Sequence, residues 1–236
     1  MVAGKRPALT RSSIIATALD LVDTVGLDEL TTRRLALELE VKSPALYWHF
    51  ANKQALLDGM GDALILSAGM GAPRPGEVWQ DWVARRARAY RAEILSHRDG
   101  ARIVAAVRVA SPETVRLFGD ELAALADFGF TPALALRTIA IVTHYVTGFV
   151  LKEQAAVDAR LNDTTGMVNP KDILSGSALD TFVEAMKTGG DPLGEDVFEH
   201  GLRMIISGTE RDLAPTFETE LQPTSSTPVP APAAPR

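Results

Sequence analysis

The side chains whose types and spacing suit a defined chemistry lie between residues 43 and 53. Hydroxyl, phenol, indole and imidazole groups follow closely from Ser43 to His49, and a lysine, Lys53, comes shortly afterwards. Such groups can donate hydrogen bonds to phosphates and base edges, while Pro44 and Tyr47 offer apolar surface to thymine methyl groups. The chemistry that this segment predicts is recognition of double-stranded DNA through the major groove.

Two short helices joined by a tight turn are expected to present these side chains. Thr31 or Thr32 can cap the first helix, because a threonine hydroxyl accepts a hydrogen bond from a free backbone N–H in the first turn. The turn is expected at residues 40–42. The apolar residues of the first helix recur at helical spacing and are expected to face a core: Leu35, Ala36 and Leu39.

The second helix begins with Ser43 followed by Pro44. This pair is typical of a helix start, with a capping hydroxyl and then a proline whose missing N–H costs nothing there. Leu46 and Phe50 lie four residues apart and are expected to face inward. The remaining side chains of this short helix are left to face outward: Ser43, Ala45, Tyr47, Trp48 and His49.

The composition places this surface on a soluble globular protein. Of the 236 residues, 46% are hydrophobic and 23% are charged, and there is no cysteine to form a disulfide or a thiol nucleophile. The net charge is −6, but residues 1–55 hold seven basic and six acidic side chains, so the deficit lies in the remainder of the chain. A few local phosphate contacts, doubled in a dimer, can supply the electrostatic attraction to DNA.

Apolar periodicity predicts an all-α protein with an N-terminal three-helix helix-turn-helix domain and a larger helical domain for ligand binding and dimerisation. We expect a flexible basic arm at 1–8, the DNA-binding domain at 9–69, the second domain at 78–213 and a proline-rich disordered tail at 214–236. A long loop is expected at 157–177. The other predicted helices are 10–25, 53–69 (capped by Asn52), 78–95, 101–109, 112–128, 132–156, 178–187 and 193–213.

Two of the later helices suggest self-association. Residues 133–151 are apolar nearly all round, and residues 197–209 mix apolar side chains with Gly201, Ser207 and Gly208. These segments are either a pair of well-buried core helices or the faces of a homodimer, and we favour the dimer. A two-fold dimer would place two recognition helices on a palindromic operator.

Residues 9–69 resemble the helix-turn-helix domain of the tetracycline-repressor (TetR) family, and the run from Leu46 to Lys53 is close to its recognition-helix signature. The resemblance extends over residues 9–213, and in the second domain the chain is similar to the tetracycline-repressor branch of that family. The segments that carry it in the second domain are 79–81, 96–101, 148–151, Gln154, 201–202 and 208–210.

The resemblance implies which residues contact DNA. Lys42 and Ala45 stand where tetracycline repressors read the operator sequence with other residues, so we expect a different operator. Arg33 would reach either a guanine edge or a phosphate, and Trp48 would contact DNA or pack in the small core. The full set of implied DNA contacts is Thr32, Arg33, Lys42, Ser43, Pro44, Ala45, Tyr47, Trp48, His49 and Lys53.

The family's ligand, a magnesium–tetracycline chelate, is not expected here. By the resemblance, Val104 replaces the metal-binding histidine and Lys152 replaces the glutamate that holds a metal-bound water. Valine offers no lone pair, and lysine repels a cation. The drug-binding residues of the family fall on Gly69, Arg86, Tyr90 and Glu121, and only the arginine beside the metal site is kept, as Arg108.

What replaces the chelate site is predicted to be an apolar pocket with a few polar groups. Two arginines in it favour an acidic or phenolic ligand, unless they pair with Glu77, Glu93 or Asp120. His144 is a further candidate. The predicted ligand-binding residues are Arg86, Tyr90, Val104, Val107, Arg108, Glu121, Leu125, Ile139 and Val142.

The sequence therefore predicts a cytoplasmic, homodimeric repressor, released from its operator by a small molecule other than magnesium–tetracycline. It has no glycine-rich phosphate loop, nucleophile elbow or paired-carboxylate motif, so we expect no enzyme activity, cofactor or metal site. No signal peptide or membrane span is expected either. Two alternatives stay open: a small-molecule-binding or modifying protein with a vestigial helix-turn-helix, and a tetracycline sensor with a rebuilt pocket.

Overall fold

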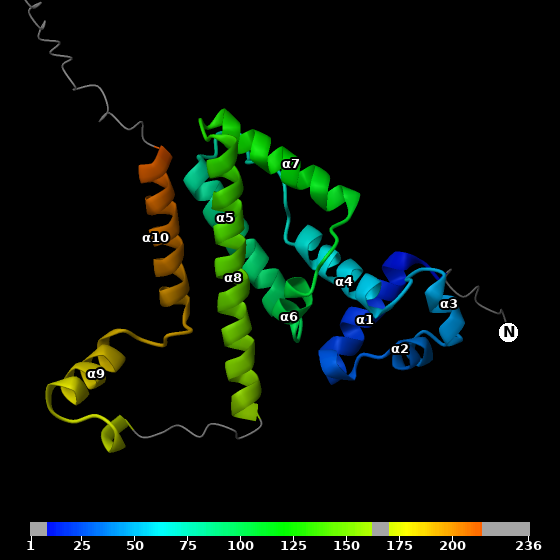
Figure 1. The fold of residues 1–236 in the computed structure, drawn as a ribbon, viewed down its shortest axis with the longest axis horizontal. Coiled ribbons are helices and arrows are strands. Elements are labelled where there is room, and N and C mark those ends of the chain that lie inside the picture. Colours follow the sequence, from blue (N-terminus) through cyan, green and yellow to red (C-terminus); the bar gives the residue numbers. More distant parts are fainter. Residues whose placement is uncertain (1–8, 162–169, 214–236) are drawn as a thin grey trace, which may run out of the picture.

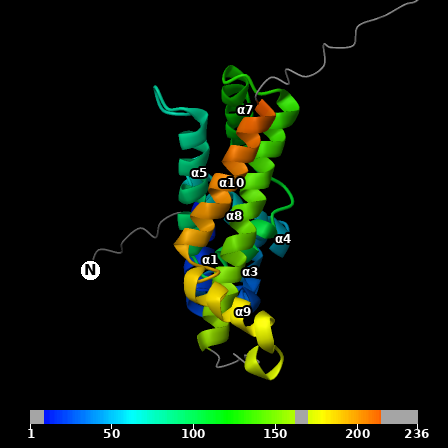
Figure 2. The same ribbon diagram turned by 90° about the vertical axis from the view of Figure 1, so that its left-hand side faces the viewer.

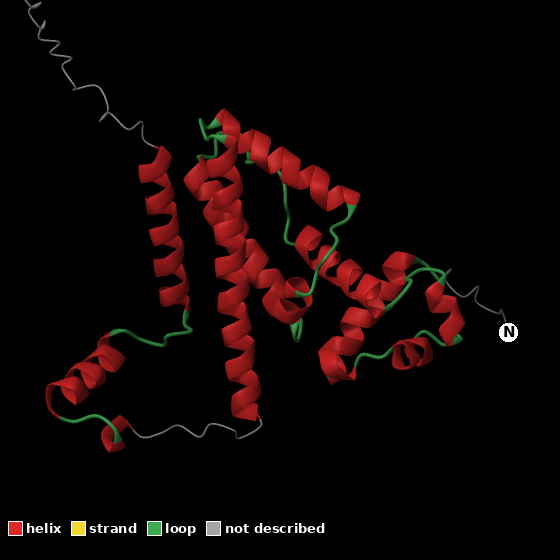
Figure 3. Cartoon of the chain, in the orientation of Figure 1, coloured by secondary structure: helices red, strands yellow, loops and turns green. Residues whose placement is uncertain are grey.

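The computed structural model describes residues 9–161 and 170–213, and within these ranges every regular element is a helix (Figure 3). The expected all-α fold is confirmed. The predicted basic arm and proline-rich tail lie outside the described residues. In chain order the helices are α1 (Arg11–Val25), η1 (Leu27–Glu29), α2 (Thr32–Glu38), α3 (Ser43–Tyr47), α4 (Lys53–Ser67), α5 (Trp79–Leu95), α6 (Gly100–Ala105), α7 (Pro112–Asp127), α8 (Pro132–Leu161), η2 (Pro170–Asp172), α9 (Gly176–Thr188) and α10 (Glu195–Leu213).

Side-chain caps fix the starts of three helices in the N-terminal unit, by which we mean helices α1 to α4. The hydroxyl of Thr10 accepts from the Ser13 N–H, that of Thr31 accepts from the Arg34 N–H, and Asn52 accepts from the Ala55 N–H at 2.8 Å. These contacts confirm the predicted threonine and asparagine caps. The expectation for Ser43 was wrong, because Lys42 is the N-cap residue of α3 and makes no side-chain capping bond.

Several helix limits differ from the periodicity-based expectations. Helix α4 ends at Ser67 because Gly69 adopts a φ of +77°. Helix α6 is short and ends at Ala105, which leaves 106–111 as a linker. Helix α8 continues to Leu161, and α9 begins at Gly176, so both ends of the predicted loop at 157–177 are helical, and 170–172 form η2. Residues 162–169 of that loop lie outside the described residues.

Helix α8 is the centre of the C-terminal domain, with α5, α6, α7 and α10 packed against it (Figures 1 and 2). By length and composition alone, its residues from Pro132 to Arg160 could cross a membrane, with a mean hydropathy of 1.5. Its contacts with four other helices identify it as the core helix of this bundle. Helix α9 lies apart from the bundle in Figure 1 and contributes no buried residue.

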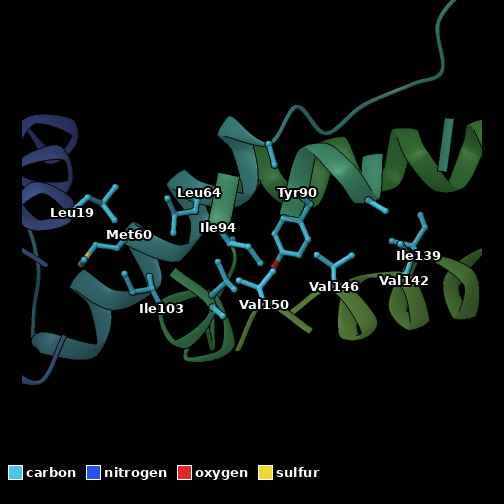
Figure 4. Close-up of a cluster of buried hydrophobic side chains, with 14 of the residues drawn as sticks. Leu19, Met60, Leu64, Tyr90, Ile94, Ile103, Ile139, Val142, Val146 and Val150 are labelled. Carbon is cyan, nitrogen blue, oxygen red and sulfur yellow. The ribbon is translucent and has the colours of Figure 1, made fainter. Parts of the chain in front are cut away.

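A continuous apolar core joins the two parts of the molecule. Figure 4 shows Leu19 and Met60 at the N-terminal end of this core and Ile139 and Val142 at the other, with Ile94 between them. Because α4 contributes to the core of both parts, a shift of α4 in one part is felt in the other.

Candidate DNA-binding face and effector cavity

Helix α3 is anchored by two apolar side chains and exposes two aromatic ones. Leu46 and Phe50 are 3% and 5% exposed, as predicted, whereas Tyr47 is 55% and Trp48 is 89% exposed. This exposure rules out a core role for Trp48 and leaves the alternative in which it faces a partner. The Arg11 guanidinium lies 4.2 Å from the Phe50 ring centroid and donates to the His49 carbonyl at 2.8 Å, which fixes the end of α3 on α1.

The residues predicted to contact DNA belong to α2, α3, the turns that follow these two helices and the start of α4. These elements lie at the end of the molecule opposite α10 (Figure 1). Exposed members of the set are Arg33, Lys42, Pro44, Tyr47, Trp48 and Lys53, and half-buried members are Thr32, Ser43, Ala45 and His49. Leu37 of α2 is 70% exposed on the same unit, although sequence reasoning did not single it out.

The C-terminal domain contains a cavity of about 50 Å³ where it meets the end of α4. Arg86 and Tyr90, both predicted to bind ligand, line it from α5. Sequence reasoning missed the contributions of α4, of Met70 and of Thr143. The complete lining is Ile65, Ala68, Met70, Arg86, Tyr90 and Thr143.

Glu121 of α7, fully buried, lies behind Arg86. Its Oε1 accepts from Arg86 Nε at 2.8 Å and from the Gly71 N–H at 3.2 Å, while Oε2 is buried without a hydrogen-bond partner. The Gly71 carbonyl in turn accepts from Trp82 Nε1 at 3.2 Å. Both backbone polar groups of Gly71, whose φ is +133°, are therefore held by side chains of the C-terminal domain.

The remaining polar groups near the cavity are also paired. The Tyr90 hydroxyl lies 3.2 Å from Thr147 Oγ1, and burial raises the pKa of this phenol although Thr147 and Arg86 oppose the rise. The neighbouring Arg85 pairs with Glu77 through two hydrogen bonds of 2.7 Å, which hold the pKa of Glu77 at about 2. The internal-pairing alternative is thus correct for Arg86, but its partner is Glu121.

Other predicted ligand-binding residues are placed elsewhere. Val104, Leu125, Ile139 and Val142 are buried in the surrounding core and are absent from the cavity lining. Val107 is half-buried and lies against α4, with its Cγ2 only 2.2 Å from where a Cβ on Gly61 would be.

Two further candidates need correction. The side chain of Arg108 is exposed, because α6 ends early and Arg108 falls on the linker that follows it. His144 is exposed on the outer face of α8. Neither of them reaches the cavity.

Three polar side chains on one face of α4 bind the 106–114 segment. Gln54 donates to the Ala106 carbonyl at 2.8 Å, and Asp58 accepts from the Arg108 N–H at 2.9 Å. Asp62 accepts from the Ser111 N–H at 2.9 Å and from the Thr114 hydroxyl at 2.6 Å. We call this set, with Gly61, the lever contact. The spacing of four residues was visible in the sequence, but the partners are mostly backbone groups and give no sequence signal.

A second contact joins the end of α1 to the turn between α5 and α6. Asp23 accepts from the Arg98 N–H at 2.8 Å and lies 2.9 Å from His97 Nδ1. The Leu27 N–H donates to Asp99 at 2.8 Å. Arg102 pairs with Asp28 at 2.7 Å, and we call this set the turn contact.

The fold and the exposed helix α3 define a helix-turn-helix DNA-binding regulator. The sequence matches the family described as "Bacterial regulatory proteins, tetR family" over residues 14–60. It also matches "Tetracyclin repressor-like, C-terminal domain" over residues 72–213. The chain belongs to the TetR family of transcriptional regulators.

Individual relatives agree with this assignment. The chain is 37% identical over 204 residues to the tetracycline repressor protein class A from transposon 1721 of Escherichia coli, covering 85% of this chain and 90% of that one. It is similar to the solved structure of TetR from Acinetobacter baumannii, with 35% identity and a TM-score of 0.66 over 88% and 100% of the two chains. It is also similar to ActR of Streptomyces coelicolor in complex with actinorhodin, with 28% identity and a TM-score of 0.72 over 88% and 100%.

Proposed function

We propose that this protein is a homodimeric repressor that leaves its operator when a small molecule binds beside α4. The observation that carries the DNA-binding part is the outward face of α3, where Tyr47 and Trp48 are 55% and 89% exposed. Tyr47 and Trp48 are neighbours, and large exposed side chains that stand together, unlike ones that are exposed singly, mark an interaction surface. A major groove accepts a helix of this kind, and the set around α3 supplies both apolar and hydrogen-bonding groups.

The dimer is supported by an unpartnered apolar stripe on the outer faces of α8 and α10. Gly148 of α8 and Gly208 of α10 have nothing within 4 Å of where a Cβ would be, which allows close approach of another helix. The exposed apolar members are Leu136 (49%), Ile141 (52%) and Leu151 (39%) of α8 and Met204 (62%) of α10. A two-fold pairing of these helices would present two α3 helices to a palindromic site in the cytoplasm.

The coupling follows from the place of α4. Its C-terminal end supplies Ile65 and Ala68 to the cavity, and its N-terminal end follows α3 directly along the chain. A molecule that widens the cavity pushes on α4 and so shifts both α3 helices relative to the operator. Such a ligand acts only to the extent that it binds the displaced arrangement more tightly than the DNA-binding one.

The effector differs from the magnesium–tetracycline chelate that one of the similar structures binds, in which a TetR of class A holds an anhydrotetracycline and magnesium. A chelated cation needs oxygen or imidazole donors. Val104 is a buried hydrocarbon without a lone pair, and Lys152 is an exposed cation on α8. Neither side chain fits the role that its position has in binding the chelate.

The experiment is a mobility shift of purified protein on the DNA upstream of its own reading frame, with excess nonspecific competitor and at near-physiological salt. If that DNA gives no shift, selection from random sequences supplies the operator. We expect Trp48→Ala and Tyr47→Ala each to weaken operator binding by about tenfold or more, the equivalent of a base contact.

The matched control is Ile173→Ala, since Ile173 is 71% exposed but lies between η2 and α9, outside the N-terminal unit. It should leave the shift unchanged. Equal binding by wild type and both α3 variants would contradict the assignment. Failure to bind any DNA would favour a ligand-handling protein with a vestigial helix-turn-helix.

A further inference from the structure

In the buried carboxylate of Glu121, one oxygen accepts hydrogen bonds and the other accepts none. Oε1 accepts from both Arg86 and the Gly71 N–H, whereas Oε2 has no donor although the residue is 0% exposed. Leaving a buried acceptor of this strength unsatisfied is costly, and the cost is recovered when a donor arrives. Glu121 does not itself line the cavity, but its other oxygen bonds Arg86, which does, so a ligand that enlarges the cavity beside Arg86 can supply the missing donor to Oε2.

The ion pair also fixes the charge that the cavity offers. Arg86 lines the cavity and is 12% exposed, and its positive charge is compensated by Glu121 at 2.8 Å. Glu121 occupies only Nε of Arg86, but an anion at the other guanidinium nitrogens would lie close to the buried Glu121 carboxylate, which repels it, and a cation would approach the guanidinium at close range. Burying a further unpaired charge in so enclosed a place is strongly unfavourable. The pair therefore selects against both kinds of charged ligand.

The other walls select for an apolar body. Ile65, Ala68 and Met70 contribute hydrocarbon and thioether surface, and Tyr90 contributes the face of a ring whose hydroxyl is already engaged by Thr147. The one further polar group of the lining is the Thr143 hydroxyl, which accepts from Arg86 Nη1 at 3.5 Å. The volume of about 50 Å³ is enough for a water or two, so a ligand enlarges the cavity. The unbranched Met70 side chain is the most adaptable part of the wall.

We propose that the effector is an uncharged, largely apolar molecule with a hydroxyl group that donates a hydrogen bond to Glu121 Oε2. This proposal rests on the proposed effector-responsive function and names the chemistry of that same site. Of the acidic or phenolic ligand expected from the sequence, it keeps the phenolic class and drops the acidic one, which assumed that Arg86 was unpaired. Phenols and alcohols satisfy the requirement, whereas carboxylates, ammonium ions and ethers do not.

The test uses four small probes that differ only in the polar group: phenol, anisole, benzoate and benzylamine. Binding is followed by NMR of methyl-labelled full-length protein, in which the Ile65 and Met70 methyl groups report occupation of this cavity. We expect phenol to bind with a dissociation constant about tenfold or more below those of the other three, because only phenol is both uncharged and a donor. Equal affinities for phenol and anisole, tighter binding of benzoate, or no shift with any probe would each overturn the proposal.

Two variants sharpen the result. Glu121→Gln removes the acceptor charge and frees Arg86, so the phenol preference should fall about fivefold or more while benzoate binding improves. Glu77→Gln is the matched control, because it unpairs the adjacent Arg85 away from the cavity lining and should leave the ranking unchanged. An unchanged ranking in Glu121→Gln would contradict the proposal, and if that variant does not fold, the wild-type ranking alone decides.

The mobility shift separates this proposal from the proposed function. Operator binding by a wild-type protein that does not prefer phenol would leave the repressor assignment in place and remove the hydroxyl-donor effector. A wild-type protein that prefers phenol but shows no specific DNA binding would remove the repressor assignment and leave the hydroxyl-donor ligand in place.

Discussion

The N-terminal unit is held to the C-terminal domain by two contacts of opposite character. In the lever contact, Asp62 is 8% exposed and its carboxylate receives two hydrogen bonds, while Gly61 lets α6 approach α4 closely. The turn contact contains one comparably buried bond, from the Leu27 N–H to Asp99, which is also 8% exposed, but the Asp28 side chain is 81% exposed and its pairing with Arg102 is open to water. Buried polar contacts resist separation far more than exposed ion pairs do.

This difference assigns separate roles to the two contacts. The lever contact is close-packed and binds α4 to the 106–114 segment at several points, so a movement of α4 must carry that segment with it. The Asp28–Arg102 pair of the turn contact can open and re-form at small cost, so this part of the contact resists a rotation of the N-terminal unit less than the lever contact does. The lever contact transmits a movement of α4, and the weaker turn contact lets the N-terminal unit rotate. Together they allow ligand binding to move the DNA-binding helices without unfolding them.

The largest expected effect comes from Gly61→Ala. A Cβ at this position would lie 2.2 Å from Val107 Cγ2 and 3.2 Å from the Ile103 carbonyl oxygen, so α4 and α6 must separate. We expect the free energy of unfolding in urea to fall by about 1–3 kcal/mol. Operator affinity, measured by fluorescence anisotropy, should fall as well, because α3 immediately precedes α4 in the chain and moves with it.

Gly119→Ala is the matched control for that change. Gly119 also lies inside a helix, but nothing is within 4 Å of its added Cβ. Removing a flexible glycine from a helix should raise stability by up to about 1 kcal/mol. Equal stabilities of the two alanine variants would mean that the lever contact is loosely packed.

A smaller loss is expected for Asp62→Ala. The change leaves the Ser111 N–H and the Thr114 hydroxyl without their common acceptor, and we expect it to lower the free energy of unfolding by about 1–2 kcal/mol. Asp120→Ala removes an exposed carboxylate from α7 and serves as the control, with little change expected. A loss as small as that of the control would place Asp62 outside the connection.

The smallest effect is expected at the turn contact and depends on pH. The hydrogen bond and charge of Arg102 lower the pKa of Asp28 from its ordinary 3.8. A carboxylate with a lowered pKa stabilises the fold above its ordinary pKa and loses that contribution as the pH falls through the lowered value. In Arg102→Gln, an NMR titration should place the Asp28 midpoint nearer 3.8. Because Arg102 also bonds the buried Asp99 at 2.8 Å, a small fall in melting temperature at pH 7 is expected, less than that of Asp62→Ala.

Arg116→Gln provides the comparison for the titration. Arg116 forms an exposed pair with Glu113 of the same helix, away from α1. Its loss should leave the Asp28 titration unchanged. A drop in thermal stability of Arg102→Gln as large as that of Asp62→Ala would show that the turn contact is as stiff as the lever contact.

The N-terminal unit was largely predictable because its signals are local. Thr31 and Asn52 cap the helices that follow them, and the spacing of Leu46 and Phe50 identified the inward face of α3. Each of these features depends on neighbours within a few residues. The one local error concerned Ser43, where the proline start was correct but the capping hydroxyl was not used.

The cavity was only partly predictable because its contacts join distant segments. Arg85 and Arg86 are adjacent in the sequence, yet they pair with Glu77 and Glu121 respectively, and helix geometry alone does not decide between these partners. Arg108 was misplaced because α6 ends at Ala105. That end is coupled to the lever contact, whose partners are backbone groups that any residue would supply.

The double anchoring of Gly71 limits how α4 can move. Gly71 follows the end of α4 closely, and Glu121 and Trp82 fasten its peptide groups to the C-terminal domain. With that end tethered, α4 is expected to pivot about it rather than slide. A helix of 15 residues is about 22 Å long, so a rotation of about 5° displaces its far end, beside α3, by roughly 2 Å. Gly71 is thus the pivot of α4, and a small expansion at the cavity produces a larger displacement of α3 relative to the DNA.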